Sequence, residues 1–147
     1  MKYAYYPGCS LHSTASDYQQ SIDSVFQRLA IELQEIEDWT CCGASAAHLS
    51  AVLLPLVLPA KDLLKVEKTG LEVVVPCAAC YNRMRQANHK LGENAELRRQ
   101  VNQVLQAEYH ARVKVRHISD VVVNEYGLEA IAKLLANDLK GMKVVCY

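Results

Sequence analysis

The sequence predicts an α/β fold in which a mainly parallel four-stranded sheet is flanked by helices, a Rossmann-like three-layer sandwich. Two observations lead to this prediction. Short apolar or alternating segments take turns with longer segments of helical periodicity, and glycine or proline stands between many of them. Strand–helix–strand units of this kind connect in a right-handed sense and give a parallel sheet. The 147 residues suffice for one domain that buries its own core.

The opening of the chain predicts a strand, a helix and a second strand. Residues 2–6 (KYAYY) form a short strand that a Pro-Gly pair ends. A helix capped by Ser13 or Ser16 is expected to run to about Ala30. Its apolar positions recur at helical spacing: Ile22, Val25, Phe26 and Leu29. Residues 32–38 alternate weakly, which predicts the second strand.

The middle of the chain contains the clearest strand. Before it, a helix is expected from about Ser45 to Lys68, kinked or broken at its two prolines and closed by Gly70. Residues 71–76 (LEVVVP) then form an apolar, β-branched run of the kind that a parallel sheet buries on both faces. A fourth strand is expected at residues 113–118 (VKVRHI).

Helices are expected after the third and fourth strands. The first begins directly at Cys77 and continues or restarts beyond Gly92. Ser119 or Asp120 is expected to cap the helix that follows the fourth strand. The later helical ranges are 96–107, 121–127 and 128–141.

The end of the chain is similar to its beginning. Residues 143–147 (KVVCY) align without a gap on residues 2–6, after a complete α/β pattern. We therefore expect residues 1–141 to form one cysteine-rich domain and residues 142–147 to begin a second, truncated repeat. The alternative is that the last residues form the final strand of one closed domain.

Charge and hydropathy exclude some classes of protein. Lys plus Arg equals Asp plus Glu at 16 each, so no nucleic-acid partner is expected. The most apolar run, residues 49–64, is interrupted by two prolines, Lys61 and Asp62, and is too short to span a bilayer. The opening residues do not contain the apolar core of a secretory leader. We expect a cytoplasmic chain with no direct membrane span.

Five of the six cysteines stand in three groups, and each group follows an expected strand. In a parallel sheet the carboxyl ends of the strands meet at one edge, so these thiols are expected to converge. The pattern is C-x31-CC-G-x33-C-x-x-C, formed by Cys9, Cys41, Cys42, Cys77 and Cys80. In a reducing compartment such cysteines indicate metal or redox chemistry rather than disulfides.

Details of the pattern favour a metal site. A C-x-x-C pair at a helix start directs two sulfurs to one point, where the helix dipole favours thiolate over thiol. The neighbours Cys41 and Cys42 point to different sides of the backbone, which suits sulfurs at different angles or a sulfur that bridges two metal atoms. Gly8, Gly43 and Pro76 are expected to be structural residues beside the site, the glycines because they let the backbone approach closely.

Four interpretations of these cysteines remain open at this point. Structural zinc often uses two C-x-x-C pairs, whereas this chain has one pair and a surplus fifth cysteine. A thioredoxin-like dithiol would use only Cys77 and Cys80. Core packing gives no reason for five cysteines to cluster. Iron–sulfur ligation is favoured, because clusters are held by thiolates at varied spacing.

The three cysteine segments resemble one known family. YYPGC, WTCCGA and VVVPCAACYNRM, in this order and at these intervals, are similar to the cysteine-rich CCG domain of the heterodisulfide reductase B subunit. The resemblance runs from Tyr5 through VRHISDVVVNEYG and covers essentially the whole chain. It implies a noncubane [4Fe-4S] cluster, one per domain, with a bridging cysteine and an adjacent cysteine pair. The implied ligands are Cys9, Cys41, Cys42, Cys77 and Cys80. Zinc is possible there as an adventitious substitute.

The same resemblance implies a function for the full-length protein. Members of the family reduce, or form, a mixed disulfide of two thiol coenzymes with two CCG domains in tandem. One domain is then half of an active site, so this chain alone is expected to be inactive. Cys146 would be a strand residue of the second repeat and no ligand. The implied partners are a second CCG domain of the same parent chain, a ferredoxin-like iron–sulfur subunit, a flavin subunit and an anionic disulfide substrate.

An electron-transfer module is the alternative function. The same domain occurs in iron–sulfur subunits resembling those of glycolate or lactate oxidases and of a membrane-anchored succinate dehydrogenase. In those complexes the partner subunits carry out the organic chemistry.

Three histidines are candidates beside the cluster, as hydrogen-bond donors or proton sources: His12, His48 and His117. For each, a surface or structural histidine is the competing interpretation. Tyr81, Asn82 and Arg83 follow the C-x-x-C pair and could bond cluster sulfides or an anionic coenzyme, or only cap the helix. Catalytic residues are otherwise unassigned.

Overall fold

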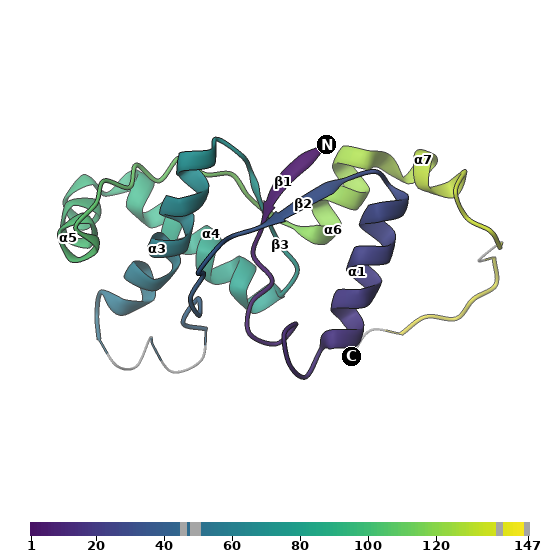
Figure 1. Ribbon diagram of the computed structural model, residues 1–147, viewed down its shortest axis with the longest axis horizontal. Coiled ribbons are helices and arrows are strands. Elements are labelled where there is room, and N and C mark those ends of the chain that lie inside the picture. The colour runs from purple at the N-terminus through teal and green to yellow at the C-terminus, as the bar shows by residue number, and fades with distance from the viewer. Residues whose placement is uncertain (45–46, 48–50, 138–139, 146–147) are drawn as a thin grey trace.

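The computed structural model describes residues 1–44, 47, 51–137 and 140–145. Four parallel strands form one sheet in the order β2-β1-β3-β4 (Figure 1), which confirms the predicted fold class. The strands are β1 (Lys2–Tyr5), β2 (Glu32–Glu35), β3 (Val73–Val75) and β4 (Val115–His117). Each is shorter than its expected range, because the register covers only a few residues before neighbouring strands diverge into loops.

Helices cover both faces of the sheet, which gives the three predicted layers (Figure 1). One face carries α1 (Ser16–Arg28), α6 (Ile118–Asp120) and the π-helical segment η1 (Val121–Gly127), with α7 (Leu128–Ala132) beyond them. The other face carries α3 (Leu54–Thr69), α4 (Ala78–Glu93) and α5 (Ala95–Leu105).

Side chains of the central strands β1 and β3 pack into a hydrophobic core on each face of the sheet. In β1, Ala4 points toward the α3–α4 layer, whereas Tyr3 and Tyr5 point toward the α1 layer. In β3, Val74 likewise faces α1 while its two neighbours face α3 and α4. The apolar run of β3 is therefore buried on both faces, as its composition predicts.

The start of α3 differs from the expectation. Among the described residues that precede this helix, 51–53 are not helical, and α3 begins at Leu54. Pro55 lies in the first turn, where a missing N–H costs nothing, so this proline begins the helix instead of breaking it. Pro59 is accommodated in the second turn while Leu63 packs into the core. Gly70 ends the helix in the left-handed conformation, as expected.

Helix caps also differ from the sequence prediction. Ala15 stands at the N-cap of α1, and the Ser13 hydroxyl donates instead to the carbonyl oxygen of Cys9. His117 is the side chain that caps α6, since it accepts a hydrogen bond from the N–H of Ser119. Asn94 separates α4 from α5 and caps the latter.

The last part of the chain contains less helix than expected. Helix α7 ends at Ala132, and the described residues 133–137 form turns and bends. Residues 142–145 are exposed and lie outside the sheet. That residues 142–147 begin a second repeat stays a prediction, and Cys146 lies outside the described residues. In the described part of the chain, no helix combines the length and apolar character needed to cross a membrane.

Candidate metal centre

The sheet topology brings all three cysteine groups to one edge. The chain crosses from β1 to β2 over one face and from β2 to β3 over the other, so β1 and β3 flank a topological switch point. Ligand sites of open α/β sheets lie outside the carboxyl ends of the strands at such a point. The cysteines follow the carboxyl ends of β1, β2 and β3: Cys9, then Cys41 and Cys42, then Cys77 and Cys80.

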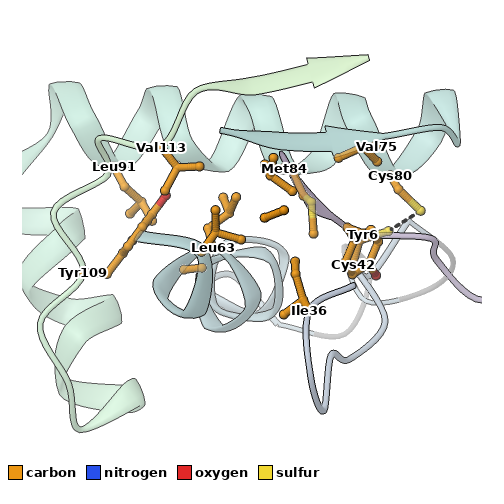
Figure 2. Close-up of a cluster of buried hydrophobic side chains, with 14 of the residues drawn as sticks. Tyr6, Ile36, Cys42, Leu63, Val75, Cys80, Met84, Leu91, Tyr109 and Val113 are labelled. Atoms are coloured by element: carbon orange, nitrogen blue, oxygen red, sulfur yellow. Dashed lines mark hydrogen bonds between the residues drawn. The ribbon is translucent and has the colours of Figure 1, made fainter. Parts of the chain in front are cut away.

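Cys42 and Cys80 form the buried part of the site. Their Sγ atoms lie 3.1 Å apart, and both side chains belong to the core beneath α3 and α4 (Figure 2). The pKa of Cys42 is lowered to about 6, first by the hydrogen bond with Cys80 and then, against the effect of burial, by the N–H of Ala44 and by Tyr6. The same hydrogen bond raises the pKa of Cys80. This contact therefore favours a thiolate on Cys42 and a thiol on Cys80.

Cys77 extends the site at the start of α4. It is half-buried, stands at the N-cap, and its carbonyl oxygen accepts from the N–H of Tyr81 at 2.8 Å. After Cys42 and burial, Cys77 also contributes to the raised pKa of Cys80, so these two thiols interact. On the other side, burial and then the charge of Cys77 raise the pKa of Tyr18 of α1.

Cys9 and Cys41 form the exposed part of the site. The hydrogen bond from the Gly43 N–H, 3.5 Å long, lowers the pKa of Cys41. Burial, the charge of Cys42 and the charge and hydrogen bond of Cys9 outweigh it, so the pKa of Cys41 is raised. The thiols therefore influence one another: Cys9 and Cys42 raise the pKa of Cys41, and Cys42 and Cys77 raise the pKa of Cys80.

The five thiols at this edge are the donors available for a metal centre. Among residues 1–44, 47, 51–137 and 140–145, no three His, Cys, Asp or Glu side chains meet around one point where a single metal ion would sit. A tetrahedral zinc needs its ligands at one point. The thiolates of an iron–sulfur cluster bind different iron atoms and can be spread out. The five cysteines provide sulfur donors of the kind that such a cluster uses.

The two glycines beside the cysteines, Gly8 and Gly43, each have a positive φ. Gly8 has a φ of 77°, and a Cβ there would lie 3.1 Å from the Sγ of Cys80. Gly43 has a φ of 76°, and a Cβ would lie 2.9 Å from the Cβ of Ala47 and 3.0 Å from Leu58. Both positions thus need glycine for the backbone conformation and for space. The turn after β1 packs directly against the C-x-x-C pair.

Two buried side chains that the sequence analysis did not single out hold the Cys41-Cys42 turn. The Tyr6 hydroxyl donates to the carbonyl oxygen of Thr40 at 2.7 Å, and an Asp62 oxygen accepts from the Thr40 N–H at 3.0 Å. Tyr6 and Asp62 have no exposed surface. The sequence does contain an indication of the role of Asp62. This residue lies in the most apolar run of the chain, where a buried carboxylate needs a hydrogen-bond partner.

Aromatic side chains connect this turn to the surface. Trp39 packs edge-on against Tyr6 with 5.3 Å between ring centroids and lies 5.5 Å from the His12 ring. Both Trp39 Nε1 and His12 Nε2 lie within hydrogen-bond distance of one Glu35 oxygen, at 2.8 and 3.2 Å. His12 is thus near the site but paired with a carboxylate.

The His117 side chain contacts the backbone of Pro76, the residue directly before the C-x-x-C pair. Its Nε2 lies 3.0 Å from the carbonyl oxygen of Pro76, and its Nδ1 lies 3.3 Å from the N–H of Ser119. A carbonyl only accepts and an N–H only donates, so Nε2 donates to Pro76 and Nδ1 accepts from Ser119. His117 therefore holds the residue before Cys77. His48, the third candidate, lies outside the described residues.

Comparison with known proteins identifies the family. A family model for the cysteine-rich domain called CCG matches residues 3–85, more than half of the chain. The chain belongs to the CCG cysteine-rich domain family. The matched region contains β1 through the first half of α4 and with them all five candidate ligands of this CCG domain.

Similar proteins are subunits of two kinds of reductase. A protein of Archaeoglobus profundus that is like the heterodisulfide reductase B subunit is 28% identical over 98% of this chain and 50% of its own length. The B subunits of CoB-CoM heterodisulfide reductases of Methanosarcina acetivorans and Methanosarcina mazei are each 22% identical over 94% of the chain and 47% of their own length. The membrane anchor subunit of the 8-methylmenaquinol:fumarate reductase of Wolinella succinogenes is 36% identical over 65% of the chain and 34% of its own length.

The CCG domain spans half or less of the length of these relatives. Its fold also occurs in a hypothetical protein of Helicobacter pylori, with a TM-score of 0.71 and 14% sequence identity over 82% of this chain and 25% of that one. That similarity supports the fold alone.

Proposed function

We propose that this CCG domain binds one noncubane [4Fe-4S] cluster through Cys9, Cys41, Cys42, Cys77 and Cys80. The observation that carries the proposal is that five cysteines follow the carboxyl ends of neighbouring parallel strands, with the Sγ atoms of Cys42 and Cys80 3.1 Å apart. Two buried sulfurs and two exposed ones give an asymmetric donor set, with one side against the core and the other toward solvent. A cluster held in this way would present its open side above Cys9 and Cys41.

The domain would work as part of a heterodisulfide reductase-like oxidoreductase. When bound, the cluster would supply electrons one at a time to a mixed disulfide of two thiol coenzymes, or take them in the reverse direction. Overall, one disulfide, two electrons and two protons give two thiols. The relatives that match nearly the whole chain are B subunits of heterodisulfide reductases or similar to them, which supports this assignment.

The residues of the chain have separate tasks in this proposal. Cys42 and Cys80 exclude water from the inner side of the cluster, because both are buried in the core. His117, through the Pro76 carbonyl, and the Ser13 hydroxyl, through the Cys9 carbonyl, hold the backbone beside a ligand in place. His12 would serve as a proton donor on the exposed side, and Glu35 orients its ring.

The partners follow from the same assignment. A second CCG domain of the parent chain would complete the active site, so the 147 residues alone would bind a cluster without turning over the anionic disulfide substrate. Electrons would come from a ferredoxin-like iron–sulfur subunit and ultimately from a flavin subunit. A cytoplasmic location of the complex belongs to this proposal.

The cofactor is tested by anaerobic reconstitution with iron and sulfide. The proposal expects about four irons and four sulfides per chain and an EPR spectrum unlike that of a cubane cluster. The Cys42→Ser variant should bind less iron, whereas the Thr14→Ser variant, altered at an exposed position, should match the unsubstituted chain. Stable zinc binding without iron uptake would contradict the proposal.

A second candidate is an electron-transfer module whose cluster never contacts an organic substrate. The 36% identity with a fumarate reductase membrane anchor subunit favours it. Glycolate or lactate oxidase complexes and succinate dehydrogenase-type complexes would be equivalent settings. Co-purification of the full-length parent chain decides: a flavin subunit together with a subunit that holds two cubane clusters supports the disulfide reductase, and a dehydrogenase subunit supports the module.

A further inference from the structure

Asp62 is a buried carboxylate on the apolar side of α3. It has no exposed surface, and its neighbours Leu63 and Val66 belong to the core. Burial of a carboxylate is costly, and an apolar side chain would fill such a position at lower cost. Packing alone therefore does not explain an acidic residue here, and its hydrogen-bond partner has to be considered.

The partner of Asp62 is the backbone immediately before the cysteine pair. Its Oδ1 accepts from the N–H of Thr40 at 3.0 Å, and the Thr40 hydroxyl lies 3.5 Å from both carboxylate oxygens. The contact joins positions 22 residues apart. It is a charge-assisted hydrogen bond between α3 and the loop after β2.

The Thr40 backbone is held from a second side by Tyr6. The hydroxyl of this buried tyrosine donates to the Thr40 carbonyl oxygen at 2.7 Å, so both polar groups of one residue are fixed by side chains from two different elements. Beyond the pair, Gly43 packs closely against Leu58 of α3. The Cys41-Cys42 turn is thus fixed at both ends.

We propose that Asp62 is a positioning residue that, together with Tyr6, holds Thr40 and so sets the directions in which the Cys41 and Cys42 sulfurs leave the backbone. The inference rests on the proposed function, because those sulfurs matter as cluster ligands. Asp62 acts through the Thr40 backbone and contacts no reacting atom.

Glu67 provides a matched control on the same helix. Its carboxylate also accepts backbone N–H groups, from His110 at 2.9 Å and Arg112 at 3.0 Å. These two residues precede β4, so they lie at the amino edge of the sheet, opposite the cysteines. Asp62 and Glu67 therefore tie the same helix to loops at opposite edges.

The experiment compares Asp62→Leu, Asp62→Asn and Glu67→Leu in the full 147-residue chain. In the metal-free reduced state, amide hydrogen exchange is measured at Thr40 and alkylation is measured at Cys42. After reconstitution with iron and sulfide, the EPR spectrum and the rate of iron release to a chelator are measured. Exchange at Thr40 and alkylation of Cys42 do not depend on a bound cluster.

We expect Asp62→Leu to accelerate Thr40 exchange, Cys42 alkylation and iron release at least about tenfold, because a hydrogen bond to a charged group is lost. Its thermal midpoint should not fall, because an apolar residue replaces a buried charge. Asp62→Asn keeps an acceptor but loses the charge, so it should accelerate Thr40 exchange and Cys42 alkylation only about two- to threefold. Glu67→Leu should leave all three rates and the EPR spectrum unchanged.

Unchanged Thr40 exchange and iron release in Asp62→Leu would overturn the inference, as would equal effects of Glu67→Leu. If Asp62→Leu does not fold, Asp62→Asn decides, because asparagine loses the charge. An acceleration of about two- to threefold confined to Thr40 and Cys42 then supports the inference, and unchanged rates overturn it. If the unsubstituted chain takes up no iron, the proposed function fails, while the metal-free rates still decide the role of Asp62.

Discussion

Gly8 lies so close to Cys80 that a Cβ on the glycine would be 3.1 Å from the cysteine sulfur. This contact joins the turn after β1 to the helix after β3, the two strands that flank the switch point. The backbone of one ligand loop therefore forms part of the wall around a ligand of another. The cysteines are arranged by contacts between loops as well as by the strands that carry them.

Gly8→Ala should weaken both the fold and the site. The φ of 77° costs an alanine about 1 kcal/mol, and the new methyl group also pushes against Cys80. We expect a loss of about 2 kcal/mol in the free energy of unfolding and a lower iron content. Gly70→Ala is the matched control, because Gly70 has a φ of 70° but no neighbouring atom within 4 Å. Urea unfolding of both variants measures the difference, and equal losses would show that the Cys80 contact contributes nothing.

Trp39 should report which metal occupies the site. It is the single tryptophan of the chain and packs on Tyr6, which adjoins Cys42. An iron–sulfur cluster absorbs visible and near-ultraviolet light, whereas zinc does not, so iron loading should quench most of the tryptophan fluorescence and zinc loading should leave it nearly unchanged. Equal emission from the metal-free and iron-loaded chains, with iron uptake verified by analysis, would place the cluster away from Cys42.

The prediction from sequence succeeded where local pattern and topology act together. The β-branched run at residues 73–75 is a buried strand, and Gly70 ends a helix as expected. Cysteines that follow parallel strands lie at one edge by necessity, so their position at the carboxyl edge of the sheet could be predicted. These features can be predicted from the spacing of apolar residues and from the rules by which parallel strands are connected.

Contacts between distant segments could not be predicted. The turn at Gly43 directs two adjacent side chains to different neighbours. Cys42 contacts Cys80, whereas Cys41 interacts with Cys9. In the local sequence Asp62 only interrupts an apolar run. Its hydrogen-bond partner Thr40 lies in another segment, so the contact could not be predicted. The sequence allowed a kink or a break at the prolines, and the structure has an interruption at residues 51–53 followed by α3; a proline both ends and begins helices, and the local sequence does not decide which.

The Cys42–Cys80 pair should make stability depend on pH in the metal-free, reduced domain. The folded pair loses its first proton near pH 6, whereas an unfolded thiol has a pKa of 9.0. Between these values the unfolded state binds more protons, so stability rises with pH by at most about 1.4 kcal/mol per unit. Above pH 9 it falls again, because Cys80 keeps its proton in the fold.

Chemical unfolding at a series of pH values under anaerobic conditions measures this dependence. Cys42→Ser removes the thiolate and should remove most of the rise between pH 6 and pH 9. Cys9→Ser is the matched control, because Cys9 is exposed and outside the pair, and it should keep the rise. A slope that survives in Cys42→Ser would assign the dependence to other groups.

Asp62 should produce the opposite dependence at lower pH. Burial raises its pKa to about 6 from 3.8, although the Thr40 N–H, Lys65 and Lys61 act to lower it. Between these values the folded state binds more protons than the unfolded state, so stability falls as the pH rises from about 4 to 6 and the cost remains at higher pH. A shift of about two units corresponds to about 3 kcal/mol.

Asp62→Asn removes the titration and retains an acceptor for Thr40, so its stability curve should be flatter between pH 4 and 6 than that of the unsubstituted chain. The buried Tyr6 hydroxyl, which also interacts with Asp62, stays protonated over this range because burial raises its pKa. Glu67→Gln is the comparison on the same helix, and its effect has the other sign. Although burial acts to raise the pKa of Glu67, its bonds with Arg112 and His110 lower it, so Glu67 adds stability as the pH rises. Chemical unfolding of all three chains at pH 4, 5 and 6 measures the difference, and parallel curves for the Asp62→Asn and unsubstituted chains would show that Asp62 is ionised throughout.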